Sequence, residues 1–207
     1  NENMVGTTTV GLVCQDGVVL ATETRATMGA LIANKAVNKL YQLDDKVGAT
    51  IAGTVSHAQT LMDVLQAEIA LYKLKNEKDM SMEAIAVLTS NILKSNAYGV
   101  QLILTGVDKK GPKLYGLDPS GSYIDDDYTS TGSGSPFAYG VLENKYRKDL
   151  TTDEGRLVAL EAISAAKQRD VYSGNGFRLA TITDEGMKTY TNEEIEDCDI
   201  CVSIPTD

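Results

Sequence analysis

Positive charge is scarce in this sequence. Its 207 residues include 19 lysines and arginines against 29 aspartates and glutamates, a formal net charge of −10. Proteins that bind nucleic acid or an anionic membrane surface present a basic face, so this balance argues against both kinds of partner. Long apolar runs are also missing, since no stretch approaches the roughly 18 apolar residues of a membrane span. The first residues lack the pattern of a secretory signal, and we expect a cytoplasmic location.

Histidine and cysteine are nearly missing as well. His57 is the one histidine, so any Ser-His-Asp or Cys-His catalytic arrangement must use it. It lies beside an expected helix N-terminus, where the helix dipole disfavours a positive imidazole, and we expect it to be non-catalytic. Three cysteines do not form the framework of a secreted disulfide-rich protein. The CxxC of Cys198 and Cys201 has neither a second ligand pair for zinc nor a thioredoxin-like unit for redox chemistry. We predict no metal and no cofactor.

What the sequence does contain is an ordinary globular balance, with 43% hydrophobic and 23% charged residues. Short β-branched segments between turn signals predict strands, and apolar residues at helical spacing predict helices. Ser56 is an expected N-cap, and Thr151 with Glu154 has the pattern of a capping box. The expected strands cover residues 7–14, 18–22, 40–43, 48–53, 100–107, 113–117, 123–128, 177–183 and 187–191, and the expected helices cover residues 56–77, 81–94, 137–146 and 151–169.

The order of these elements is strands, two helices, strands, two helices and strands. It is neither a continuous alternation of strands and helices nor an all-strand pattern. Helices that come in pairs must cover sheets, and two sheets face to face with helices outside them are an economical arrangement. No linker, repeat or low-complexity run divides the chain, and one domain of this length can bury a sizeable core. We therefore predict a single-domain α+β fold.

Two segments could carry chemistry. Residues 132–135, Gly-Ser-Gly-Ser, could hold a phosphate at a helix N-terminus, but they lack the ending of a P-loop, and a tight turn explains them as well. The other segment is the run of threonines that begins at Thr7, after Gly6. If the Gly6–Thr7 bond is cut, Thr7 carries a hydroxyl and a free α-amine, whose ordinary pKa of about 7.7–8.0 suits a base. Such a nucleophile needs no histidine, although an edge strand also explains this run.

Several motifs, in the same order along the chain, resemble those of proteasome β subunits, most closely the archaeal ones. The resemblance covers residues 6 to about 194. The motifs are Thr7-Thr8-Thr9-Val10-Gly11 after Gly6, Ala21-Thr22-Glu23-Thr24-Arg25-Ala26-Thr27, Asn38-Lys39-Leu40-Tyr41, Ile51-Ala52-Gly53, Thr131-Gly132-Ser133-Gly134-Ser135 with Tyr139-Gly140-Val141-Leu142-Glu143, and Lys167-Gln168-Arg169-Asp170 with Ser173-Gly174. The chain departs from the family pattern around His57, in the short segment 95–100, and at Val171-Tyr172.

The resemblance implies the fold of N-terminal-nucleophile hydrolases, a four-layer αββα sandwich of two antiparallel sheets flanked by helix pairs. It implies a threonine endopeptidase that degrades unfolded polypeptides and assembles with α subunits and other β subunits in stacked heptameric rings. It further implies that residues 1–6 are a propeptide, removed autocatalytically between Gly6 and Thr7, and that residues 7–207 form the one domain.

The resemblance also assigns residues to roles. Thr7 is the nucleophile, Lys39 is the cation beside it, and Glu23 orients Lys39. Positive neighbours lower the pKa of Lys39 and Glu23 raises it, and the sequence leaves this balance open. The backbone N–H of Gly53 is an oxyanion donor. The residues that support the Thr7 amine are Ser135, Asp170 and Ser173, and the residues expected to bind substrate are Arg25, Ala26, Thr27, Val37, Tyr41, Ile51 and Val55.

Other functions remain open from the sequence. Some members of this family are structural ring subunits without activity, but this chain keeps the residues that carry activity, which favours an enzyme. A different N-terminal-nucleophile amidohydrolase would more often use cysteine or serine. A binding module that uses the Gly-Ser segment is the remaining alternative.

Overall fold

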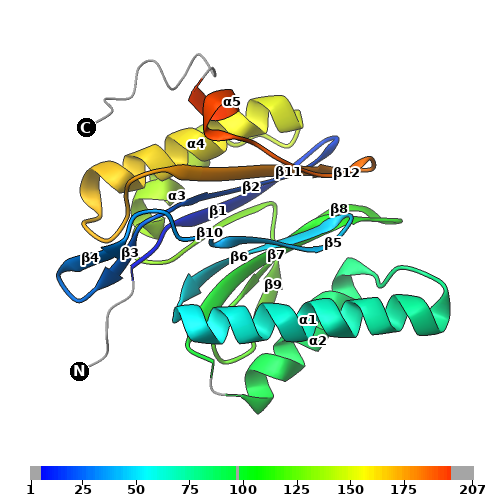
Figure 1. Ribbon diagram of the computed structural model, residues 1–207. Helices are drawn as coiled ribbons and strands as arrows, with labels where there is room; N and C mark the ends of the chain where they lie inside the picture. Colours follow the sequence, from blue (N-terminus) through cyan, green and yellow to red (C-terminus); the bar gives the residue numbers. More distant parts are fainter. Residues whose placement is uncertain (1–5, 97, 197–207) are drawn as a thin grey trace.

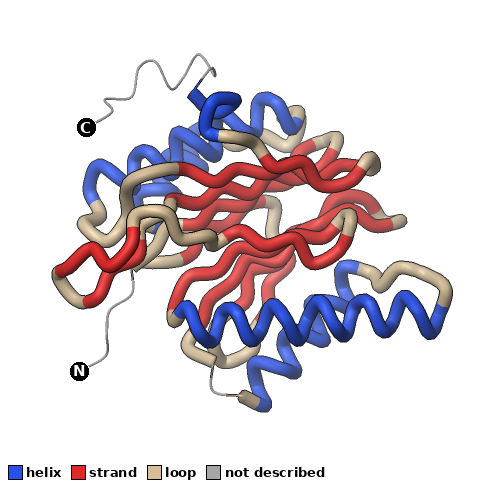
Figure 2. Tube along the Cα trace, viewed as in Figure 1, coloured by secondary structure: helices blue, strands red, loops and turns tan. Residues whose placement is uncertain are grey.

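The computed structural model of this protein describes residues 6–96 and 98–196. Two five-stranded antiparallel sheets lie face to face (Figures 1 and 2). The first has the order β10-β1-β2-β11-β12, and the second has the order β5-β6-β7-β8-β9. The strands of the first are β1 (Thr9–Cys14), β2 (Gly17–Glu23), β10 (Tyr128–Thr131), β11 (Phe177–Thr183) and β12 (Gly186–Thr189). Those of the second are β5 (Leu40–Asp44), β6 (Val47–Gly53), β7 (Val100–Asp108), β8 (Gly111–Leu117) and β9 (Tyr123–Asp125).

Helices cover the outer face of each sheet, as Figure 1 shows. The helices α1 (Val55–Asn76) and α2 (Met82–Ser95) pack on the second sheet, and α3 (Ser135–Lys145) and α4 (Thr152–Arg169) pack on the first. The short α5 (Asn192–Glu196) follows β12. This arrangement confirms the predicted four-layer αββα sandwich. Among the helices that the structure describes, none combines the length and apolar character needed to cross a bilayer.

Apolar side chains fill all three interfaces between the four layers. One cluster joins α1 and α2 to the second sheet, and another joins α3 and α4 to the first. Between the sheets, Leu20 of β2 packs with Ile103 of β7 and Leu114 of β8. Every residue of β2 is buried, because this strand lies inside a covered sheet. Its apolar run from residue 18 to residue 21 is therefore continuous rather than alternating.

Several sequence expectations need correction. The N-cap of α1 is Thr54, not Ser56. The single strand expected over residues 123–128 is two strands in different sheets, because β9 pairs with β8 whereas β10 pairs with β1. A two-stranded hairpin of β3 (Ala26–Met28) and β4 (Leu31–Asn34) was not expected, nor was α5. The capping box of Thr151 and Glu154 is confirmed at the start of α4. Cys198 and Cys201 lie outside the described residues.

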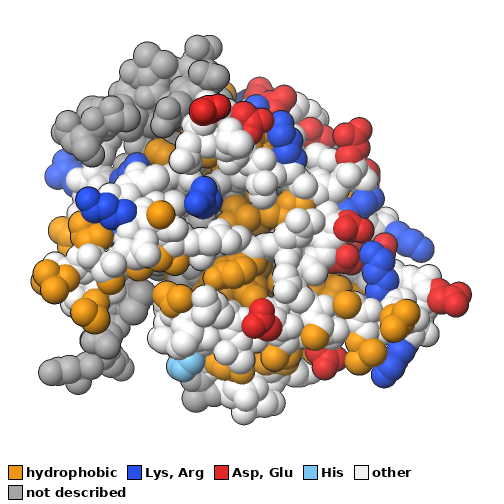
Figure 3. Space-filling model, in the orientation of Figure 1, with side chains coloured by type: hydrophobic (Ala, Val, Ile, Leu, Met, Phe, Trp, Pro, Cys, Tyr) orange, Lys and Arg blue, Asp and Glu red, His pale blue; other side chains and the backbone are white. Residues whose placement is uncertain are grey.

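The β3–β4 hairpin projects from one end of the two sheets, close to where the described chain begins (Figure 1). It carries exposed apolar side chains, which Figure 3 shows at the left of the molecule; Leu31 is 67% exposed and Met28 59%. The end of the sheets beside this hairpin is also where the chain leaves β2 and enters β1 and β5 (Figure 1). The residues singled out for chemistry meet at that end.

Candidate active site

Thr7 lies just before β1 and is almost fully buried, with 2% of its surface exposed. In the described chain it is joined to Gly6 by an intact peptide bond. Its hydroxyl donates a hydrogen bond to the Gly6 carbonyl oxygen at 2.6 Å, and its backbone N–H donates to Ser133 Oγ at 3.2 Å. The backbone N–H of Gly6 donates to Thr27 Oγ1 at 3.4 Å. Each polar group of the Gly6–Thr7 bond therefore has a partner in the site.

Glu23, at the end of β2, and Lys39, just before β5, form a buried ion pair. The Lys39 ammonium donates to Glu23 Oε1 and, at 2.5 Å, to the backbone oxygen of Arg25. The backbone N–H groups of Thr8 and Arg25 also donate to the Glu23 carboxylate, at 3.2 and 2.6 Å. So many donors hold this carboxylate in place and, through it, the lysine.

The pKa of Lys39 is lowered from its ordinary value of 10.5, chiefly because burial disfavours the ammonium. The charge of Glu23 and its hydrogen bond act in the opposite direction, and the charge of Arg25 adds to the lowering. Burial therefore decides the direction of the Lys39 pKa shift, which the sequence left open. A lysine of this kind is neutral more often than a surface lysine, so it can accept a proton.

Asp170 is the centre of a second network, at the C-cap of α4. Its Oδ2 accepts from both Ser133 Oγ and Ser173 Oγ at 2.6 Å, and its Oδ1 accepts from the backbone N–H of Tyr172 at 3.2 Å. Because the one hydroxyl proton of Ser173 points to Asp170, the 2.6 Å contact between Thr8 and Ser173 has the Thr8 hydroxyl as donor. Two chains of hydrogen bonds thus run from the Thr7–Thr8 segment to one carboxylate.

The assignment of Ser135 to the Thr7 nitrogen is corrected by this geometry. The bonded hydroxyl belongs to Ser133, two residues earlier in the same Gly-Ser segment. Ser135 is instead the first residue of α3, where its backbone N–H donates to the Gly132 carbonyl. Thr8 is a further member of the network that the sequence analysis did not single out. The sequence does not distinguish Ser133 from Ser135, because both follow a glycine in the same short segment. The turn before α3 decides which of the two hydroxyls reaches Thr7.

Gly53 ends β6 in a conformation that requires glycine. Its φ is +135°, and a Cβ there would lie 2.3 Å from the Gly99 carbonyl oxygen. The Gly99 carbonyl in turn accepts from the Thr54 N–H at 3.2 Å, and the Gly99 N–H donates to His57 Nδ1 at 3.3 Å. The two departures from the family pattern, around His57 and in segment 95–100, therefore touch each other beside Gly53.

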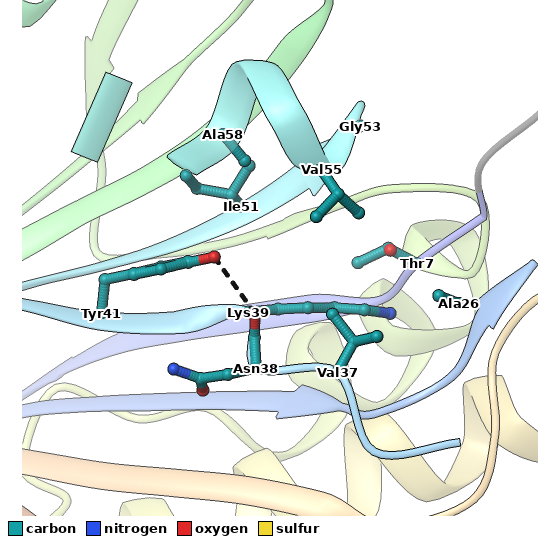
Figure 4. A pocket seen from close by; sticks show the side chains of 10 residues that line it. All are labelled: Thr7, Ala26, Val37, Asn38, Lys39, Tyr41, Ile51, Gly53, Val55 and Ala58. Atoms are coloured by element: carbon teal, nitrogen blue, oxygen red, sulfur yellow. Dashed lines mark hydrogen bonds between the residues drawn. The ribbon is translucent and has the colours of Figure 1, made fainter. Parts of the chain in front are cut away.

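A pocket opens beside Thr7, and Figure 4 shows its lining. The Thr7 hydroxyl and the Lys39 amino group lie at the same end of it. Most of the remaining wall is apolar, and Tyr41 donates its hydroxyl to the Asn38 carbonyl at 3.2 Å. Burial raises the pKa of Tyr41, so its phenol stays neutral. The lining residues are Thr7, Ala26, Val37, Asn38, Lys39, Tyr41, Ile51, Gly53, Val55 and Ala58.

Two of the expected substrate-binding residues do not line this pocket. Arg25 turns toward the 170–175 segment, where its guanidinium donates to the Val171 carbonyl and to Asn175 Oδ1 at 2.9 and 3.0 Å. Thr27 binds the N–H of Gly6. Conversely, Asn38 and Ala58 are lining residues that the sequence analysis missed. Within the described part of the chain, no three histidine, cysteine or acidic side chains gather as metal ligands do.

Comparison with known proteins gives a consistent answer. Residues 4–182 match the family model described as proteasome subunit. The chain is 72% identical over 194 residues to a protein of Methanosphaera stadtmanae named proteasome subunit beta, covering 94% of this chain and 95% of that one. It is 53% identical to the protein of that name from Methanothermobacter thermautotrophicus, over 94% and 95% of the two chains. It is 51% identical to that of Methanobrevibacter ruminantium, over 92% of each chain.

Proposed function

Because this chain belongs to the proteasome subunit family as a β subunit of the archaeal type, we propose that Thr7 is the nucleophile of its peptidase activity. Such a subunit is a threonine endopeptidase that acts with an N-terminal nucleophile. The observation that carries the assignment is the position of Thr7, whose hydroxyl shares one end of an apolar pocket with Lys39. Its nitrogen is linked through Ser133 to Asp170.

Maturation is the first reaction that this geometry supports. Thr7 Oγ attacks the carbonyl carbon of Gly6, and its proton passes to neutral Lys39, because the Thr7 nitrogen is still an amide and cannot serve as the base. The Gly6–Thr7 C–N bond then breaks as the nitrogen takes up a proton, which leaves an ester between Gly6 and Thr7 Oγ. Water hydrolyses the ester and releases residues 1–6 as a propeptide. Residues 7–207 remain as the mature domain, with a free amine at Thr7.

Peptide cleavage by the mature chain follows the same path with an added base. The Thr7 amine, held by Ser133 and in turn by Asp170 and Ser173, takes the proton of the attacking hydroxyl. The positive charge of protonated Lys39, which Glu23 holds in place, favours the developing alkoxide. The Gly53 N–H stabilises the oxyanion, since glycine lets the substrate approach the backbone closely. No metal or cofactor takes part in this proposal.

Assembly with other subunits into a proteasome core is implied by the family. We propose that the partners are α subunits and further β subunits in stacked heptameric rings, which act on unfolded polypeptides in the cytoplasm. The enclosed rings would restrict access to the nucleophile to substrates that are threaded into the chamber.

Covalent labelling tests the proposed nucleophile. A β-lactone probe should acylate Thr7 of the assembled mature chain and add its mass to the N-terminal peptide. The matched control is Thr9→Ala, which removes a hydroxyl from the same run of threonines and should leave labelling at Thr7 intact. Labelling at another residue, or equal labelling of a chain that starts with alanine in place of Thr7, would refute the assignment.

A further inference from the structure

The space beside Gly6 is filled by another residue of the chain. A Cβ built on Gly6 would lie 1.7 Å from Cβ of Tyr172, 2.5 Å from its Cγ and 2.9 Å from Ser133 Oγ. Contacts below 3.0 Å at a Cβ are essentially never found in proteins, so nothing larger than glycine fits at position 6 while Tyr172 keeps its place. Tyr172 and its neighbour Val171 form one of the places where the sequence departs from the family pattern.

Tyr172 is held where it is by the catalytic network itself. Its N–H donates to Asp170 Oδ1, and the next residue, Ser173, donates its hydroxyl to Oδ2 of the same carboxylate. On the other side, the Arg25 guanidinium binds the carbonyl of Val171 at 2.9 Å. The 170–173 turn is therefore fixed at two points, and the backbone of Tyr172 cannot carry its Cβ away from Gly6 without breaking these bonds.

Gly6 is constrained from its other sides too. Its N–H is bound to Thr27 Oγ1, and its carbonyl oxygen accepts from the Thr7 hydroxyl. Glycine alone would explore many backbone conformations, because it has no side chain to restrict them. A wall at the position of its missing Cβ removes much of that freedom. Since reacting groups displaced by about one ångström can lose roughly a hundredfold in rate, such a wall matters for the attack on this carbonyl.

We propose that Tyr172 is a positioning residue for self-cleavage, which holds the Gly6 carbonyl against Thr7 and makes glycine obligatory at position 6. The inference rests on the proposed removal of residues 1–6 by Thr7. It assigns no part in the chemical step to Tyr172, which lies against Gly6. The shape of the site, with Tyr172 in the space of a Cβ at position 6, also explains why a glycine precedes the nucleophile.

Rescue of a steric clash is the test. The full chain is mixed with its cognate α subunits, and the intact mass of the precursor is followed over time. Gly6→Ala should slow cleavage about a hundredfold or more, because the new Cβ displaces the carbonyl. Adding Tyr172→Gly to Gly6→Ala should restore the rate to within about tenfold of the unaltered chain, because the Cβ introduced at position 6 then fills the space that Tyr172 vacates and restricts the backbone in its place. Adding Tyr172→Ala should restore much less of the rate, since alanine keeps the Cβ at position 172, which would lie 1.7 Å from a Cβ at position 6.

Two controls make the result specific. Val171→Gly loosens the same turn but removes a side chain that is 73% exposed, so it should not rescue Gly6→Ala. Thr7→Ala should leave the propeptide uncut whatever residue 172 is. The positioning role of Tyr172 is refuted if Gly6→Ala is cleaved at the normal rate, if Tyr172→Gly fails to rescue Gly6→Ala, or if Val171→Gly rescues it equally. Cleavage of Thr7→Ala after Gly6 would instead refute the proposed self-cleavage.

Discussion

Lys39 and Glu23 form a buried ion pair whose lysine can act both as a base and as a fixed positive charge. Two buried ions cost desolvation energy, and their attraction compensates for it only with good geometry and further hydrogen bonds. Here the carboxylate is well supplied with donors, whereas burial lowers the pKa of the lysine. The pair thus keeps Glu23 in place and allows Lys39 to lose its proton.

Loss of the lysine should abolish the activity of the site. We expect Lys39→Ala to reduce peptidase kcat/KM by about a thousandfold or more, because transition-state stabilisation of this size is typical of such electrostatic groups. Assembly should be retained, as judged by size-exclusion mass. Lys35→Ala is the matched control, since Lys35 is an exposed lysine of the same segment. More than about a tenth of normal activity in assembled Lys39→Ala would exclude the role.

Self-cleavage should depend on pH with a definite sign. Lys39 must be neutral to take the Thr7 proton, so the rate of precursor conversion should rise with pH and level off below the ordinary lysine pKa of 10.5. Glu23 raises the pKa of Lys39, so Glu23→Gln should move this plateau to lower pH. Intact mass measured over a series of buffers gives both profiles. A rate that ignores pH, or a shift of the Glu23→Gln profile to higher pH, would contradict the account.

At the scale of single residues, the motifs located the candidate site but not every atom of its hydrogen-bond networks. Motifs assigned Thr7, Glu23, Lys39 and Asp170, and the structure brings all four to one end of the sheets. The choice between Ser133 and Ser135 was wrong because both lie in a Gly-Ser repeat whose side-chain directions depend on where α3 begins. Direction within a turn is a tertiary property that spacing does not reveal.

Among the elements, α4 links a stabilising cap to the catalytic network. It begins at the capping box of Thr151 and Glu154 and ends at Asp170. Thr151→Ala should lower the free energy of unfolding by about 1 kcal/mol, which is the usual cost of losing such a cap. For a domain of this size the melting temperature should fall by about 2–4 °C. Thr60→Ala, an exposed helical threonine of α1, is the control, and an equal loss there would deny the cap any special role.

The pocket between β5, β6 and the start of α1 should select apolar residues. Its wall includes Val37, Ile51 and Ala58 but no carboxylate, and its one ammonium is already bound to Glu23. A charged substrate side chain would be desolvated there without a partner, which costs several kcal/mol. In a fluorogenic peptide panel, kcat/KM should be highest after Leu, Phe or Tyr. Faster cleavage after Arg or Asp would contradict this pocket assignment.

Regular elements with a clear period were predictable, and short exposed ones were not. The capping box and the apolar spacing placed α4 and α2 within a residue or two of their ends. The β3–β4 hairpin escaped prediction because its strands are short and Leu31–Asn34 is exposed throughout, which removes the alternation that marks a half-buried strand. The split of residues 123–128 into two sheets was hidden because a chain that changes sheets shows no break in its composition.

For the whole molecule, the sandwich explains how distant segments make one site. Thr7 precedes β1 and Glu23 ends β2 in the first sheet, Lys39 precedes β5 and Gly53 ends β6 in the second, and Asp170 is the C-cap of α4. No single layer holds the nucleophile, the lysine and the pocket together. Maturation by Thr7 therefore requires the sheets to be stacked, and we expect ring assembly to complete the geometry. We expect precursor conversion only after α subunits are added.

The central claim is that Thr7 acts on its own chain and then on substrates. N-terminal sequencing of the assembled protein tests it most directly. The unaltered chain should begin at Thr7 once α subunits are present, whereas Thr7→Ala should keep Gly6 and the residues before it. Thr7→Ser, which retains a hydroxyl, should still be cut. A Thr7→Ala chain cleaved cleanly after Gly6 would show that another agent does the cutting and would contradict the account.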